Sequence, residues 1–113
     1  MNNMVATLEV SSNEGTFDDE AIARYQAAWQ HTGIEPRINW YRGFRRSERP
    51  PRNTVVQPTL ICWGEDDVGL VPSMAERSLD YCETGRLRTF PDASHWVHHE
   101  REAVTDELLD HLS

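Results

Sequence analysis

The 113-residue sequence contains no lysine: its 11 basic residues are all arginine, against 19 aspartate and glutamate residues. The formal net charge is therefore −8 with histidine neutral. Because a chain of this sign repels phosphate backbones, the composition disfavours nucleic-acid binding as a property of the whole chain. The arginine bias fits either a high-salt cytoplasm or a high-GC genome, and the sequence leaves both open.

Long apolar runs are absent as well. No segment approaches the ~18 consecutive apolar residues that a membrane-spanning helix needs. The N-terminus also lacks the charged start and short apolar stretch of a secretory signal peptide. We therefore expect no membrane contact and predict a cytoplasmic protein, with a length that suits one domain rather than two.

Cysteines and glycine-rich motifs are scarce. Cys62 and Cys82 are too few to define a disulfide framework, so both thiols are expected to be reduced. No glycine-rich phosphate loop is present, which leaves nucleotide binding without support. His98 and His99 are adjacent and cannot share one helix face, and no further ligand stands at a suitable spacing. We predict no cofactor and no metal.

The first half of the sequence predicts a helical segment. Residues 1–15 are polar and are expected to be a poorly ordered lead. Residues 16–46 predict two helices, the first capped by Thr16 and ended by Gly33. The second runs from about Glu35 to Arg46, with Pro36 in its first turn. Residues 47–53, which contain two consecutive prolines, are expected to be an extended linker.

The second half predicts alternating strands and helices. Residues 59–63 form a continuous apolar run typical of a buried strand, and residues 86–90 indicate a second strand. Helical patterns cover residues 71–82 and 100–111. Residues 54–113 therefore predict a βαβα unit with parallel strands and a right-handed crossover, an α/β fold.

An acid follows the first predicted strand and a histidine follows the second. Asp67 and His95 are 28 positions apart, and the carboxyl ends of parallel strands meet at one edge of a sheet. An aspartate bonded to one imidazole nitrogen fixes the tautomer and leaves the other nitrogen free to accept a proton. Asp66 is the second choice for the acid, and Glu65 also competes. The alternative interpretation is an exposed acidic turn without catalytic function.

Two longer segments carry a family resemblance. Pro-Thr-Leu-Ile-Cys-Trp-Gly-Glu-Asp-Asp (58–67) and Gly-Arg-Leu-Arg-Thr-Phe-Pro-Asp-Ala-Ser-His-Trp-Val-His-His-Glu-Arg-Glu (85–102) resemble the C-terminal strands and loops of the α/β-hydrolase fold. Within that fold they are most similar to epoxide hydrolases, with haloalkane and haloacetate dehalogenases close. The resemblance implies that Asp67 is the acid and His95 the histidine of a catalytic triad.

The predicted helical segment extends the resemblance. Ala-Arg-Tyr-Gln-Ala-Ala-Trp-Gln (23–30) and Ile-Asn-Trp-Tyr-Arg (38–42) are similar to cap-domain helices of the same enzymes. The resemblance implies that Tyr41 donates a hydrogen bond to the epoxide oxygen. Trp96 and Trp40 are the aromatic candidates for the substrate pocket, and both could instead serve in packing. Tyr25 and Trp29 are expected in the core of the cap.

One part of the family pattern is missing from these 113 residues. The sequence has neither a Gly-x-(Ser/Asp)-x-Gly nucleophile turn nor a His-Gly-type oxyanion loop. We therefore predict an epoxide hydrolase-like chain, apparently truncated, that acts on a small hydrophobic epoxide or haloalkane only in the complete enzyme. Its expected partner is an upstream hydrolase fragment or a second copy. The alternatives are a non-catalytic interaction module, and, among enzymes, a dehalogenase or an esterase.

Overall fold

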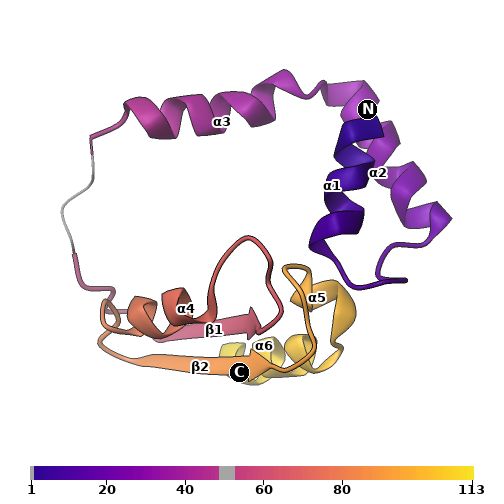
Figure 1. The fold of residues 1–113 in the computed structure, drawn as a ribbon. Coiled ribbons are helices and arrows are strands. Elements are labelled where there is room, and N and C mark those ends of the chain that lie inside the picture. The colour runs from indigo at the N-terminus through magenta and orange to yellow at the C-terminus, as the bar shows by residue number, and fades with distance from the viewer. Residues whose placement is uncertain (1, 49–52) are drawn as a thin grey trace.

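The computed structural model describes residues 2–48 and 53–113 and has an α/β fold (Figure 1). Part of the predicted linker, residues 49–52, lies outside the described residues. The elements in chain order are α1 (Asn2–Ser11), α2 (Asp19–Thr32), α3 (Glu35–Arg46), β1 (Thr59–Gly64), α4 (Pro72–Leu79), β2 (Gly85–Phe90), α5 (Val97–Glu100) and α6 (Ala103–Leu112).

The two strands form a parallel pair, which confirms the sequence prediction. β1 pairs with β2 in a register that runs from Thr59 opposite Gly85 to Gly64 opposite Phe90. Parallel strands need a crossover connection, and α4 provides it. The carboxyl ends of both strands therefore lie on the same side of the sheet. The loops that carry Asp67 and His95 begin there.

Helices α4 and α6 cover opposite faces of this sheet. Along β2, Arg86 and Arg88 both form ion pairs with Glu107 of α6, at 3.4 and 3.1 Å. Gly85 lies on the alternate face, where an added Cβ would stand 2.7 Å from the Leu79 side chain of α4. Because side chains alternate along a strand, the even-numbered positions of β2 face α6 and the odd-numbered positions face α4.

The main core lies between the sheet and the C-terminal helices. Phe90, Ala93, Val97 and Val104 are buried together, and Cys62 of β1 packs against them. Every member comes from β1, from β2 or from the chain that follows β2. The core therefore fixes the segment that carries His95 against the end of β1.

The N-terminal residues form a helix, so the prediction of a poorly ordered lead for residues 1–15 is wrong. In α1, Met4, Val5 and Leu8 recur at helical spacing, and Leu8 is buried. The hydroxyl of Ser11 accepts a 2.8 Å hydrogen bond from the indole N–H of Trp96. The apolar periodicity of α1 and the hydrogen bond to Trp96, 85 positions away in sequence, explain why this polar segment forms a helix.

Helix α2 begins later than predicted. Its N-cap is Asp18, whose carboxylate accepts a 2.7 Å hydrogen bond from the Ala21 N–H, and not Thr16. The predicted end is correct, because α2 ends at Thr32 and Gly33 follows at φ 71°, a conformation that glycine tolerates. The hydroxyl of Thr16 donates instead to Glu100, at 2.7 Å.

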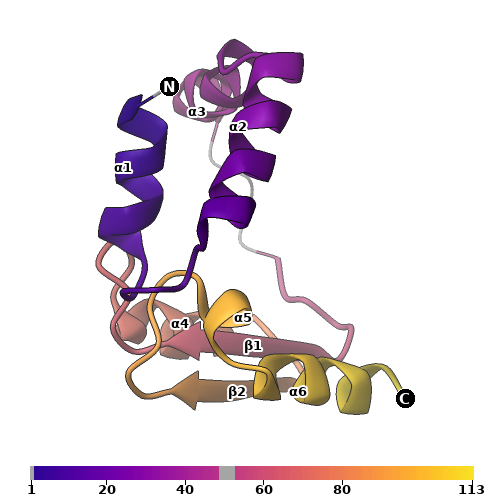
Figure 2. The ribbon, with the colours of Figure 1, turned by 90° about the vertical axis from the view of Figure 1, so that its right-hand side faces the viewer.

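Helix α3 has the predicted bounds but buries none of its residues. In both ribbon views it lies beyond the far end of α2, away from the sheet (Figures 1 and 2). Its aromatic side chains are therefore exposed in the part of the chain that the structure describes.

The C-terminal helix, predicted from Glu100 to His111, begins at Ala103, and a short helix that was not predicted precedes it. The one-turn helix α5 ends at Glu100, and Arg101 is extended at φ −134° before α6 begins. The break lets the Arg101 guanidinium donate to the backbone carbonyl of Asp92, at 2.9 Å. This contact with a residue nine positions earlier explains why the helical pattern does not continue through Arg101.

Candidate active site

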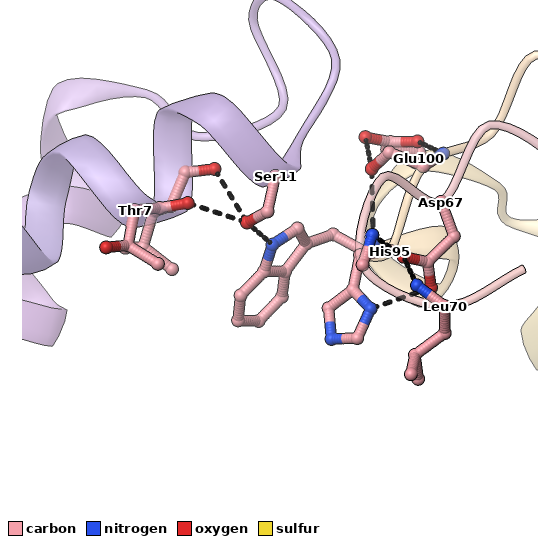
Figure 3. Close-up of polar contacts among 10 residues, drawn as sticks. Thr7, Ser11, Asp67, Leu70, His95 and Glu100 are labelled. Atoms are coloured by element: carbon pink, nitrogen blue, oxygen red, sulfur yellow. Dashed lines mark hydrogen bonds and ion pairs between the residues drawn. The ribbon is translucent and has the colours of Figure 1, made fainter.

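The structure brings Asp67 and His95 into direct contact (Figure 3). The Nδ1 atom of His95 lies 2.8 Å from Oδ2 of Asp67, although the residues are 28 positions apart. The Asp67 side chain exposes 7% of its surface, whereas the His95 side chain exposes 45%. The pair therefore combines a shielded carboxylate with an imidazole that solvent can reach.

The second carboxylate oxygen of Asp67 is held by its own loop. The backbone N–H groups of Gly69 and Leu70 donate to Oδ1 at 2.8 and 3.0 Å. Burial alone would raise the pKa of Asp67, but the hydrogen bonds from His95, Gly69 and Leu70 outweigh it and hold the pKa below its ordinary value. Asp67 is thus ionised at neutral pH.

The charge on Asp67 determines which imidazole nitrogen carries the proton. An ionised carboxylate only accepts hydrogen bonds, so Nδ1 of His95 donates to it. In a neutral imidazole the Nε2 atom then keeps its lone pair. No described residue hydrogen-bonds Nε2, and Figure 3 shows this end of the ring directed away from Asp67. The geometry suits a general base that takes a proton from water.

Backbone contacts join the two loops that carry the pair. The Glu65 N–H donates to the Phe90 carbonyl at 3.1 Å, and the Asp66 N–H donates to the Ala93 carbonyl at 2.9 Å. At Gly64 an added Cβ would stand only 2.1 Å from the Ser94 carbonyl oxygen. Glycine at the end of β1 therefore permits the close approach of the two loops.

Asp66, the second choice for the acid, is placed differently. Its side chain is exposed, and it makes no hydrogen bond with His95, whose described carboxylate partner is Asp67. Its backbone N–H, rather than its carboxylate, contributes to the site. Of the two candidates, the geometry therefore favours Asp67 as the acid that orients the histidine.

Trp96 lies beside the histidine within an aromatic cluster. Its ring is 5.8 Å from the His95 ring, 5.1 Å from Phe17 and 6.3 Å from Tyr25, centroid to centroid. The Tyr25 hydroxyl is in turn 3.4 Å from Nε2 of His99. The cluster joins α2 to the loop that carries His95, so Trp96 serves in packing and also borders the histidine.

Tyr41 and Trp40 are not brought to the pair. They expose 71% and 73% of their surfaces, and neither forms a hydrogen bond or ring contact with Asp67 or His95 in the described residues. Trp40 instead borders a shallow hollow on α3 itself, with Asn39 and Phe44. The role of Tyr41 as a hydrogen-bond donor to the epoxide oxygen and the role of Trp40 in the substrate pocket remain predictions.

Glu100 is a residue that the sequence reasoning missed. Its carboxylate accepts hydrogen bonds from Ser94, Asn13 and Thr16. Burial raises its pKa, but these donors outweigh burial and bring the pKa to about 2. In the sequence it was only one acid among 19, and the sole available signal was its position at the end of the segment resembling the hydrolase histidine loop.

Two kinds of feature are absent from residues 2–48 and 53–113. None of their helices combines the length and apolar character that crossing a membrane requires. No group of three or more histidine, cysteine, aspartate or glutamate side chains in these ranges is arranged to hold a metal ion.

An acid in contact with a histidine, each following one of two adjacent parallel strands, is the arrangement that the family resemblance implies. Comparison with known proteins points to the same family. The chain is 33% identical over 104 residues to the AB hydrolase superfamily protein YfhM of Bacillus subtilis (strain 168). It is 30% identical over 105 residues to Epoxide hydrolase 2 of Caenorhabditis elegans and 32% identical over 73 residues to Epoxide hydrolase 4 of Homo sapiens.

The chain belongs to the α/β-hydrolase superfamily, and its similarity corresponds to a C-terminal portion of that fold. The matches cover 88%, 87% and 64% of this chain but 36%, 28% and 20% of the respective relatives. The chain therefore spans about a third of the length of the first two relatives. No family model matches the sequence, and no solved structure matches it significantly.

Proposed function

We propose that the chain supplies the acid and the histidine of an epoxide hydrolase-like site. Asp67 would orient and support the imidazole, and His95 would deprotonate the water that hydrolyses an ester intermediate. The 2.8 Å contact between His95 Nδ1 and Asp67 Oδ2, with Nε2 unengaged by any described residue, is the observation that carries the proposal. Three of the relatives described as epoxide hydrolases support the choice of chemistry.

The nucleophile for this reaction would come from outside the 113 residues. In the full reaction a carboxylate attacks an epoxide carbon, the carbon–oxygen bond breaks and the alkoxide takes a proton from a donor such as Tyr41. Water activated by His95 then attacks the ester carbonyl, which releases the diol and restores the carboxylate. We therefore expect negligible turnover by the chain alone and turnover in a complex with a nucleophile-bearing fragment.

Complementation tests this proposal. The purified chain would be mixed with the part of Caenorhabditis elegans Epoxide hydrolase 2 that it does not match, and styrene oxide hydrolysis would be measured. We expect turnover from the mixture but from neither component, and a loss of about 10⁴-fold with His95→Ala. Turnover by the chain alone, or turnover of the mixture that survives His95→Ala, would contradict the proposal.

Substrate choice is tested in the same mixture. The same acid and histidine could serve carbon–halogen or ester chemistry, so a haloalkane and a p-nitrophenyl ester would be assayed beside the epoxide. We expect the epoxide to be turned over fastest. A faster haloalkane or ester reaction would reassign the substrate class while the roles of Asp67 and His95 stay the same.

A second candidate function is an interaction module without turnover of its own. β1 and β2 pair only with each other in the described sheet, which leaves one open edge on each strand. Large apolar side chains stay exposed on α3, on the segment after Asp67 and on α6: Ile38, Trp40, Tyr41, Phe44, Val68, Leu70, Val71, Met74, Leu108, Leu109 and Leu112. Such surfaces favour association with a hydrolase fragment or a second copy.

A further inference from the structure

Glu100 lies at the end of α5 and receives an unusual number of donors. Its Oε1 atom accepts from the Asn13 N–H at 2.9 Å, from the Thr16 hydroxyl at 2.7 Å and from the Ser94 hydroxyl at 2.6 Å. Its Oε2 atom accepts from the Ser94 N–H at 2.7 Å and from the Asn13 side-chain amide at 3.1 Å. Five neutral donors therefore surround one carboxylate.

These donors come from two segments that are remote in sequence. Asn13 and Thr16 belong to the loop between α1 and α2, whereas Ser94 directly precedes His95. Ser94 is buried, and both its backbone N–H and its hydroxyl bond to Glu100. The carboxylate thus connects the α1–α2 loop to the backbone of the histidine loop.

The opposite side of the histidine loop rests on β1. The Ser94 carbonyl oxygen stands against Gly64, and the Ala93 carbonyl accepts from the Asp66 N–H. Ser94 is therefore held between the end of β1, which leads to Asp67, and the Glu100 carboxylate. The position of His95 relative to Asp67 depends on both supports.

Further contacts, in which Asn13 again takes part, fix the start of the histidine loop. Asp92 has a positive φ of 59°, and its carbonyl accepts from the Asn13 side chain at 2.6 Å and from Arg101 at 2.9 Å. These bonds hold the loop two residues before Ser94. Of the two neighbours of His95, Ser94 is bonded to the Glu100 carboxylate and Trp96 to the Ser11 hydroxyl.

We infer that Glu100 is a positioning residue for His95: through Ser94 it sets the imidazole against Asp67, and through Asn13 and Thr16 it couples that setting to the α1–α2 loop. The inference rests on the proposed role of His95 as a base. None of the described hydrogen bonds of Glu100 involves the imidazole, so we assign it no part in proton transfer. Its effect is on the fraction of molecules in which Nδ1 donates to Asp67.

Glu100→Gln tests the inference, because the amide keeps the shape of the side chain but has one acceptor oxygen for five donors. Glu102→Gln is the matched control, since it removes the same charge two residues away at an exposed side chain that makes no cap hydrogen bond. The readouts are ¹⁵N NMR of the His95 ring, which reports which nitrogen is protonated, and hydrogen exchange of the Ser94 amide.

We expect wild type and Glu102→Gln to show His95 protonated at Nδ1 with a protected Ser94 amide. In Glu100→Gln, Ser94 exchange should be about tenfold faster or more, and Nδ1 protonation of neutral His95 should fall. Unchanged exchange and an unchanged tautomer in Glu100→Gln would overturn the inference. Wild-type His95 protonated at Nε2 instead would overturn the proposed function itself, so the two failures are distinguishable.

A milder variant covers the case in which Glu100→Gln does not fold. Thr16→Val removes a hydroxyl that lies 2.7 Å from Glu100 Oε1 and 2.8 Å from the Asn13 carbonyl oxygen, while keeping the side-chain shape. The variant should also speed hydrogen exchange of the Ser94 amide, by a smaller factor than Glu100→Gln does. The Thr16 hydroxyl has no described hydrogen bond with Ser94 or His95, so such an effect would pass through Glu100. Ser94 exchange equal to that of wild type would overturn the inferred coupling to the α1–α2 loop.

Discussion

At the scale of single residues, the geometry of the site depends on Gly64 as well as on Asp67 and His95. Gly64→Ala should lower the free energy of unfolding by about 2–3 kcal/mol, because the new Cβ meets backbone atoms of Ala93 and Ser94 that cannot move away cheaply. The measurement is urea unfolding.

Gly69→Ala is the control for this change. The nearest atom to its added Cβ is Asp67 Oδ1 at 3.5 Å, an ordinary contact distance. Its effect should be within about 0.5 kcal/mol. Equal destabilisation by the two substitutions would contradict the close approach at Gly64.

The pH dependence of stability follows from two carboxylates. The pKa of Asp67 is lowered and that of Glu100 falls from 4.5 to about 2, so in both cases the unfolded state binds more protons in acid. The stability that Glu100 contributes is fully present above about pH 4.5 and is lost as pH falls toward 2. Urea unfolding between neutral pH and pH 2 measures the loss.

Glu100→Gln should remove part of this pH dependence. The variant lacks the titrating group, so its stability should fall less steeply between pH 4.5 and 2 than that of wild type. The matched variant Glu102→Gln should keep the wild-type slope. Parallel curves for wild type and Glu100→Gln would show that the carboxylate network is not formed in solution.

The contact between Asp67 and His95 could be anticipated from the sequence because the signals for both residues are local. Asp67 and His95 each follow a strand-like run, and the carboxyl ends of parallel strands meet at one edge of a sheet. The sequence therefore predicts that the two side chains lie close together. Glu100 had only a weak local signal, since two of its partners, Asn13 and Thr16, lie more than 80 positions away in sequence. The local pattern at Thr16 predicts a helix cap, whereas its hydroxyl bonds to Glu100, 84 positions away in sequence.

At the scale of elements, the boundary of α2 offers a direct test of capping. Asp18→Ala removes the only side-chain bond to the Ala21 N–H and should destabilise the first turn by about 1 kcal/mol. Hydrogen exchange of the first α2 amides should rise about fivefold. Asp19→Ala, which removes an acid of the first turn but no capping bond, should have a smaller effect; an equal effect would contradict the cap assignment.

The βαβα elements of residues 54–113 could be predicted because their sequence patterns are short-range. The helices before β1 were harder to predict from the sequence. Apolar runs and glycine breaks placed β1, α4 and β2 within a few residues of their bounds. α1 was missed because its packing depends on Trp96 and the α1–α2 loop rather than on its own composition. The break between α5 and α6 was missed because it depends on the contacts of Arg101.

At the scale of the whole molecule, the chain is more extended than a compact domain. Its radius of gyration is 16.4 Å, against about 13 Å for a compact domain of this length. Helix α3, which lies beyond the far end of α2 and away from the sheet, contributes to this extended shape (Figures 1 and 2). Tyr41 lies on this exposed helix, and its role stays a prediction from the family resemblance.

We therefore predict that the chain self-associates when no partner is present. Light scattering after size-exclusion chromatography should give a mass above the 13.1 kDa of the monomer. A Trp40→Ser and Phe44→Ser double variant should shift the mass towards the monomer, because it removes two exposed aromatic groups from α3. Val10→Ser, an equally exposed position on α1, serves as the control. A compact wild-type monomer would contradict association through α3.

The central claim is that Asp67 holds His95 with Nδ1 protonated and Nε2 free as the base. The most direct measurement is the ¹⁵N NMR spectrum of the His95 ring in wild type, Asp67→Asn and Asp66→Asn, at a pH where the imidazole is neutral. We predict protonation at Nδ1 in wild type and in Asp66→Asn, and its loss in Asp67→Asn. Protonation at Nε2 in wild type, or the same spectrum in all three proteins, would contradict the claim.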